Sequence, residues 1–154
     1  MPTVEESIYI PKPPEEVFKF IVDPASPTQW DATAIDFHLD DDGPMKAGSR
    51  TSGTSRVLGR RIDWKAEITE FETSRRVVSR TVEGPMGFTL TLTTQPEGDG
   101  TRFTSHVEAE TGLGGIFGKI TDPLVQKAYA RTTRANLETL LEILTEHPQH
   151  ETTL

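Results

Sequence analysis

Residues 122–146, DPLVQKAYARTTRANLETLLEILTE, are the stretch that decides the fold. Asp122 is a good N-cap and Pro123 a good first helical residue, and helical apolar periodicity continues to the end of the stretch. Roughly 25 residues at about 1.5 Å each give a helix of about 37 Å. Such a helix can cross a whole domain, and His147-Pro148 is expected to end it.

The chain before this helix has the pattern of successive strands. Residues 3–10 alternate apolar and polar side chains, which is typical of a strand. Two short helices follow, opening near Pro14 and Pro27, because proline suits a first helical turn. Further strand-like runs, separated by turns rich in glycine, proline and aspartate, predict an antiparallel meander over residues 34–39, 49–58, 61–71, 76–83, 88–94 and 102–111.

The composition is that of one globular domain. With 154 residues, the chain can bury about two thirds of its unfolded surface, and we assign residues 2–147 to one domain and 148–154 to a disordered tail. The net charge of −8 disfavours a nucleic-acid partner. The lack of cysteine excludes disulfides and thiolate chemistry. No signal peptide or apolar run of roughly 20 residues is present, so we expect a cytoplasmic monomer or homodimer without integral membrane association.

The inner face of the long helix changes character along its length. Its second half offers large side chains that fill a core: Leu137, Leu140, Leu141 and Leu144. Its first half offers a mostly small stripe: Leu124, Ala128, Thr132 and Ala135. Small residues on a core-facing stripe indicate either a close approach to the sheet or unfilled space. Because a curved sheet cannot follow a straight helix throughout, we expect a cavity; the alternative is that aromatic side chains fill the gap.

The order of elements and four local motifs together resemble a known superfamily. The motifs are IPKPPEEVFKFIVDPASPTQW at 10–30, AGSR at 47–50, ITEFETSRRVVSRTVEGP at 68–85 and GDGTRFTSHVEAE at 98–110. Over residues 3–147 the chain is similar to the polyketide cyclase/dehydrase branch of the START/Bet v1-like (SRPBCC) superfamily. The resemblance implies an α+β helix-grip fold, in which a seven-stranded curved antiparallel sheet surrounds the C-terminal helix and two short helices follow the first strand.

The glycine-rich segment TGLGGIFGK at 111–119 raises the question of a nucleotide site. Its glycines do not match G-x-G-x-x-G, and Ile120 stands where a P-loop needs serine or threonine. In folds of the resembled superfamily this segment lies at the cavity mouth. We therefore interpret it as a gate that bends at Gly112, Gly114 and Gly115, with Phe117 closing over an apolar ligand.

The cavity predicts a binding module for a small hydrophobic or amphipathic molecule, lipid- or polyketide-like. The expected ligand-binding residues are Trp30, Phe37, Trp64, Phe88, Leu90, Phe103, Ser105, Phe117, Leu124, Ala128 and Thr132. The alternative, implied by the resemblance, is an enzyme of the cyclase, aromatase or dehydratase kind that uses the same cavity for positioning and proton transfer.

No catalytic constellation can be assigned from the sequence. Polar groups with a plausible inward direction include Asp63, Arg80, Ser105, Tyr129 and Thr132, but they match no known arrangement. No pair of histidines has metal-ligand spacing, so we expect neither a metal nor another cofactor.

Charge along the long helix opposes its dipole. Basic residues occupy its first half, at Lys127, Arg131 and Arg134, and acidic residues its second, at Glu138, Glu142 and Glu146. Two explanations remain open: pairing with acidic groups elsewhere in the domain, or attraction of an anionic ligand or carrier to the mouth.

Overall fold

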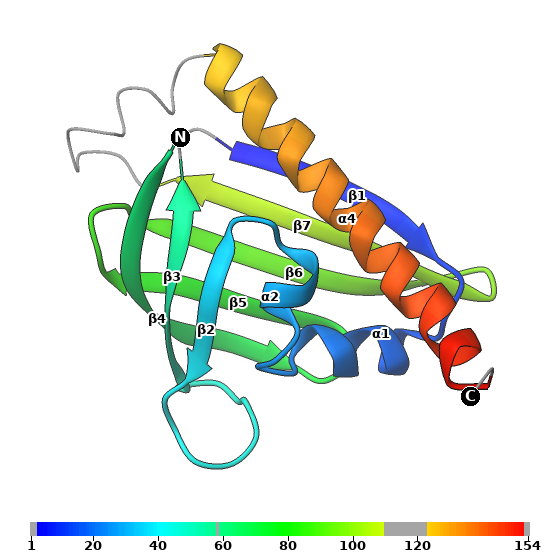
Figure 1. The fold of residues 1–154 in the computed structure, drawn as a ribbon. Coiled ribbons are helices and arrows are strands. Elements are labelled where there is room, and N and C mark those ends of the chain that lie inside the picture. The colour runs from blue at the N-terminus through cyan, green and yellow to red at the C-terminus, as the bar shows by residue number, and fades with distance from the viewer. Residues whose placement is uncertain (1–2, 58, 110–122, 153–154) are drawn as a thin grey trace.

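The computed structural model describes residues 3–57, 59–109 and 123–152 (Figure 1). Within them, one antiparallel sheet has seven strands in the order β1-β7-β6-β5-β4-β3-β2. The strands are β1 (Thr3–Ile10), β2 (Ala34–Leu39), β3 (Arg50–Val57), β4 (Arg60–Glu72), β5 (Arg76–Glu83), β6 (Phe88–Glu97) and β7 (Gly100–Ala109). The predicted meander is confirmed, with strand bounds that differ by only a few residues.

The sheet curves because of its turns and bulges. Gly59 and Gly98 take φ values of +80° and +57° in the β3–β4 and β6–β7 turns, a region that favours glycine. The register shifts between Ala34 and Asp36 in β2. It shifts twice more in β4 against β5. Such irregularities bend a strand and increase its twist, so the sheet wraps around an interior.

The helices α1 (Pro14–Ile21), α2 (Pro27–Trp30) and α4 (Pro123–Thr152) lie on the same face of the sheet (Figure 1). Helix α4 runs along edge strand β1, α2 contacts the opposite edge strand β2, and α2 also contacts α4. The two edges of the sheet are therefore joined through helices. This arrangement confirms the expected helix-grip fold.

The main core lies where α1 meets the second half of α4 (Figure 1). Its buried members are at most 6% exposed and come from β1, α1, β7 and α4: Ile10, Val17, Ile21, Phe103, Leu137 and Leu140. Burying a large aliphatic or aromatic side chain contributes about 1.5–3 kcal/mol. This cluster therefore fixes the helix on the sheet at one end and leaves the first half of α4 free to border a cavity.

Helix α4 continues to Thr152, beyond the end expected at His147-Pro148. The division into a domain over residues 2–147 and a tail over 148–154 stays a prediction. An interior proline removes one helical hydrogen bond and its ring crowds the carbonyl four residues back, yet the helical backbone continues past Pro148. Within the described part of the chain, no helix is long and apolar enough to span a bilayer.

Candidate ligand-binding cavity

A cavity of about 260 Å³ lies between the inner face of the sheet and helices α1, α2 and α4. Strands β2 to β7 all contribute to its wall. The large apolar side chains of the lining include Ile21, Trp30, Phe37, Met45, Ile62, Trp64, Ile68, Met86, Phe88, Leu90, Leu92 and Val107. The aromatic side chains therefore border the space without filling it, and the alternative of a completely packed interior is wrong.

Most of the residues expected from the sequence line this cavity. They are Trp30, Phe37, Trp64, Phe88, Leu90, Ser105 and Thr132; their role in binding stays a prediction. Phe103 lies behind the wall in the core, with its ring centroid 6.1 Å from that of Trp30. The gate glycines Gly112, Gly114 and Gly115, together with Phe117, lie outside the described residues.

The face that α4 presents to the cavity differs from the expected stripe. Leu124 is 76% exposed, and Ala128 and Ala135 are also exposed. The lining residues from α4 are instead Tyr129, Thr132, Thr133 and Asn136. Of the expected stripe, only Thr132 lines the cavity. The other members were misplaced because the stripe was chosen for small side chains. Counting back from the core residue Leu137 in steps of four reaches Thr133 and Tyr129. This helical periodicity in the sequence could have identified the face of α4 that lines the cavity.

Alternation along the strands also decides which polar groups point inward. Because Ile62 and Trp64 line the cavity, the intervening Asp63 is exposed and accepts a 2.8 Å hydrogen bond from Thr54 Oγ1. Arg80 is exposed as well. Neither residue belongs to the described lining, so both are wrong as inward polar candidates.

Trp64 is held as a fixed wall of the cavity by three neighbours. Its Nε1 donates to Ser55 Oγ at 2.9 Å, and its ring lies 5.8 Å from that of Phe37, tilted by 52°. Gly53, opposite Trp64 on β3, makes room for the indole, since a Cβ there would stand 2.8 Å from Trp64 Cζ2. Glycine at this position therefore permits the close approach of a strand and an aromatic ring.

Polar groups gather where the α2–β2 connection meets α4, and we call Asp31, Thr33, Tyr129 and Asn136 the polar corner. Asp31 Oδ1 accepts hydrogen bonds from Thr33 N (2.9 Å), Thr33 Oγ1 (2.7 Å) and Asn136 Nδ2 (3.1 Å). Asn136 Oδ1 in turn accepts from Ala32 N at 3.1 Å. The two bonds of Asn136 join segments more than 100 residues apart in the chain. All four residues of the polar corner line the cavity.

The environment of Tyr129 disfavours the anionic form of its phenol. Burial raises the pKa of Tyr129 to about 12, and the nearby Asp31 carboxylate acts in the same direction. Both causes disfavour the phenolate anion. Tyr129 is therefore a protonated donor at neutral pH beside a carboxylate. Asp31 was not foreseen as a lining residue, and neither was Asn136.

Asp31 is the single carboxylic acid among the lining residues that the structure describes, and that set contains no lysine, arginine or histidine. No cluster of His, Asp or Glu in the same part of the chain could hold a metal. The described lining thus offers an apolar wall, several neutral polar groups and one carboxylate.

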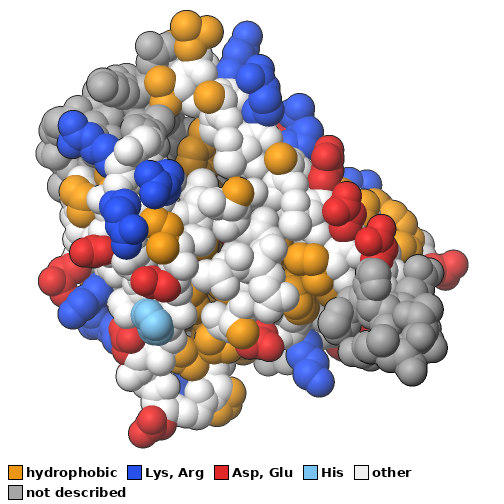
Figure 2. All heavy atoms as spheres, viewed as in Figure 1, with side chains coloured by type: hydrophobic (Ala, Val, Ile, Leu, Met, Phe, Trp, Pro, Cys, Tyr) orange, Lys and Arg blue, Asp and Glu red, His pale blue; other side chains and the backbone are white. Residues whose placement is uncertain are grey.

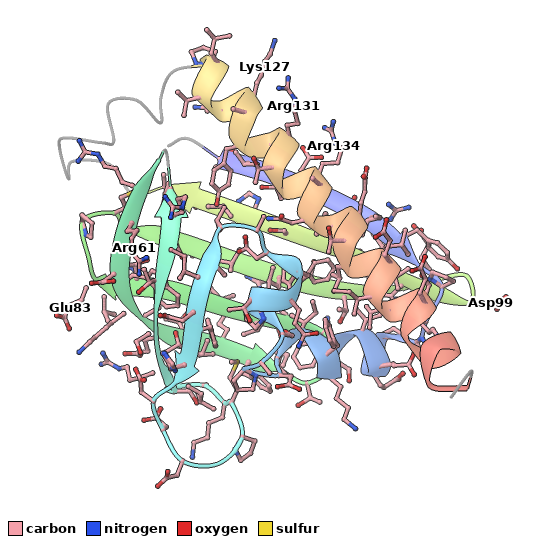
Figure 3. All side chains as sticks on the ribbon, in the orientation of Figure 1. Arg61, Glu83, Asp99, Lys127, Arg131 and Arg134 are labelled. Atoms are coloured by element: carbon pink, nitrogen blue, oxygen red, sulfur yellow. The ribbon has the colours of Figure 1, made fainter. Side chains whose placement is uncertain are left out.

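The lysine and arginine residues of α4 lie in its first half. Lys127, Arg131 and Arg134 lie along one side of the first half of the helix (Figure 3), and none of them belongs to the described lining of the cavity. Figure 2 shows basic side chains along that half and acidic ones further on. Arg134 Nε lies 3.1 Å from Oε1 of Glu6, whose side chain on β1 is only 18% exposed. For Arg134, pairing with an acidic group of the domain accounts for a charge that opposes the dipole.

Comparison with known proteins agrees with this architecture. The sequence matches the family described as polyketide cyclase / dehydrase and lipid transport over residues 1–144. No curated protein matches the chain. Among solved structures, TTHA0849 from Thermus thermophilus is 26% identical, with a TM-score of 0.75 over 92% of this chain and 95% of that one.

Two further structures share the fold at lower identity. The Zhui aromatase/cyclase from Streptomyces sp. R1128 is 15% identical, with a TM-score of 0.72 over 94% of this chain and 93% of that one. A START superfamily protein from Mycobacterium smegmatis is 14% identical, with a TM-score of 0.70 over 90% and 94%. With the family match over nearly its whole length and the sheet wrapped around α4, the chain belongs to the polyketide cyclase/dehydrase and lipid transport family.

Proposed function

We propose that this protein binds a small amphipathic molecule, largely apolar and lipid- or polyketide-like, in the cavity between the sheet and α4. The observation that carries the proposal is the cavity of about 260 Å³ with apolar walls and a polar corner. An apolar cavity of about 150 Å³ accommodates benzene, so this one has room for a molecule of one or two rings or a short chain. Family membership supports the same function.

The affinity can be estimated from the apolar surface that a ligand buries. A ligand the size of an aromatic side chain buries about 200 Å², which at about 25 cal/mol per Å² gives about 5 kcal/mol. That corresponds to a Kd of about 0.2 mM before other costs of association are counted. Hydrogen bonds in the polar corner, at about 1 kcal/mol each, bring the expected Kd into the micromolar range.

The two tryptophans of the chain both line the cavity, so intrinsic fluorescence reports directly on its contents. Titration with 1-octanol, a neutral amphipath that does not absorb at these wavelengths, should change the tryptophan emission saturably. Native mass spectrometry of the gently purified protein should reveal any molecule that co-purifies. An emission that stays constant up to the solubility limit of 1-octanol, together with an unmodified native mass, contradicts the proposal.

A second candidate function, an enzyme of the cyclase, aromatase or dehydratase kind, is favoured by one observation. Tyr129 and Asp31 place a protonated phenol and a carboxylate together at the cavity wall. A carboxylate base and a neutral hydrogen-bond donor suit proton abstraction next to a carbonyl group. The test is deuterium exchange beside the carbonyl of 2-tetralone, followed by NMR. If the protein is such an enzyme, it should accelerate this exchange, and Asp31→Asn should abolish the acceleration. Exchange at the buffer rate in the presence of the wild-type protein contradicts the enzymatic function.

The composition adds expectations that the structure leaves untested. The absence of a nucleic-acid partner rests on the net charge of −8, and a cytoplasmic location rests on the sequence patterns described above. A monomeric or homodimeric state is a further expectation. Fractionation of the native cells and light scattering of the purified chain are the corresponding measurements.

A further inference from the structure

We propose that the polar corner makes the cavity selective for ligands that carry a neutral hydroxyl group and excludes the matching carboxylates and phosphates. This inference rests on the proposed binding function and names the class of ligand. It follows from how the carboxylate of Asp31 is held and from the chemistry of the remaining wall.

The hydrogen bonds to Asp31 converge on one of its two oxygens. Oδ1 accepts from both the backbone and the hydroxyl of Thr33 and from the amide of Asn136. No described residue donates a hydrogen bond to Oδ2, although a carboxylate can accept about four. With Oδ1 fixed by three donors, Oδ2 is an acceptor of defined position on a residue that borders the cavity.

A neutral hydroxyl group on a ligand can both donate a hydrogen bond to the polar corner and accept one from it. Its proton can be donated to the Asp31 carboxylate, and its oxygen can accept from the phenol of Tyr129, which is protonated at neutral pH as tyrosine ordinarily is. A hydrogen bond to a charged acceptor is roughly twice as strong as one between neutral groups. The apolar body of the ligand then lies against Trp64 and the strand side chains.

An anionic group finds hydrogen-bond donors but no positive charge in the described lining. That lining contains no lysine, arginine or histidine, so an anion loses its hydration without gaining a counter-ion. Two like charges about 6 Å apart at an effective dielectric constant of about 20 weaken binding by on the order of a hundredfold. Arg134 does not offset this, because it is not a lining residue and its guanidinium pairs with Glu6 of β1 (Figure 3).

The test compares naphthalene, 2-naphthol and 2-naphthoate by calorimetry at neutral pH, since the three share one apolar body. We expect 2-naphthol to bind on the order of a hundredfold more tightly than 2-naphthoate, with naphthalene between them. The isosteric variant Asp31→Asn keeps an oxygen that can accept from Thr33 and Asn136 but removes the charge. It should reduce the preference for 2-naphthol over 2-naphthoate to less than about tenfold, since the Coulomb repulsion is gone.

The outcomes separate the two claims. Binding of naphthalene without preference between 2-naphthol and 2-naphthoate overturns the selectivity and leaves the binding function intact. An unchanged preference in Asp31→Asn overturns the selectivity in the same way. Failure of all three compounds to bind overturns the binding function and the selectivity together. The ratio measured on the wild-type protein decides the selectivity even where the variant does not fold.

Discussion

The assignment of the inner face of α4 can be tested by a matched pair of substitutions one helical turn apart. Thr132 lines the cavity, whereas Ala128 is exposed. Thr132→Phe directs a ring into the existing space, and Ala128→Phe directs the same ring into solvent. Neither side chain takes part in a hydrogen bond between described residues that the substitution would break.

The magnitudes follow from the size of the cavity. A phenylalanine side chain buries about 150–250 Å², comparable to the whole ligand surface estimated above, so Thr132→Phe should remove nearly all of the roughly 5 kcal/mol of apolar binding energy. Burial of the ring contributes about 1.5–3 kcal/mol, against an overpacking cost of about 1–3 kcal/mol. The melting temperature should therefore change by no more than a few degrees.

The assay is tryptophan emission during a 1-octanol titration, with thermal unfolding of each variant measured alongside. Thr132→Phe should fold and show no saturable change, while Ala128→Phe should bind as the wild type does. Normal binding by Thr132→Phe together with lost binding by a folded Ala128→Phe refutes the assignment of the helix face.

Three further substitutions or titrations probe the walls and the polar corner. Gly53→Ala should destabilise the fold by about 1–3 kcal/mol and alter the emission of Trp64, because the new Cβ would lie 2.6 Å from the backbone oxygen of Asp36 and 2.8 Å from the Trp64 ring; an unchanged melting temperature and spectrum contradict these close contacts. Asn136→Ala should cost about 1–3 kcal/mol, since it leaves buried groups unpaired, and a chemical denaturation curve like that of the wild type counts against the bridge. An ultraviolet titration should show Tyr129 ionising near pH 12 rather than its ordinary 10.0. Because only the unfolded state loses that proton between these values, unfolding free energy should fall as pH rises through this window, and less so in Tyr129→Phe.

The sequence predicted the fold well because its information on strands and turns is local. Alternation places Phe37, Trp64 and Leu90 on one face without knowledge of the partner strands. Turn glycines such as Gly98 fix where hairpins reverse. The cavity was also predictable, because a straight helix meets a curved sheet. The strand positions and the side chains that face the interior from each strand were therefore largely predicted correctly.

The polar corner could not be read in the same way. The bond between Asn136 and Asp31 joins residues 105 positions apart, and no local pattern indicates it. The stripe through Ala128 failed because side-chain size was weighted over helical phase. The end of α4 was misplaced because Pro148 was treated as a stop, whereas the helix continues through it to Thr152. Each error concerns tertiary contact or helix phase rather than the type of element.

The central claim, that a small amphipathic molecule occupies the cavity, is tested most directly by methyl NMR during a titration with 2-naphthol. The lining supplies methyl groups at Ile62, Leu90 and Val107, whereas Val82 is 45% exposed and does not border the cavity. We predict saturable shifts of the lining methyl signals with the signal of Val82 unchanged. Shifts confined to Val82 and other surface methyl groups, or no shift at any methyl group, would contradict the claim.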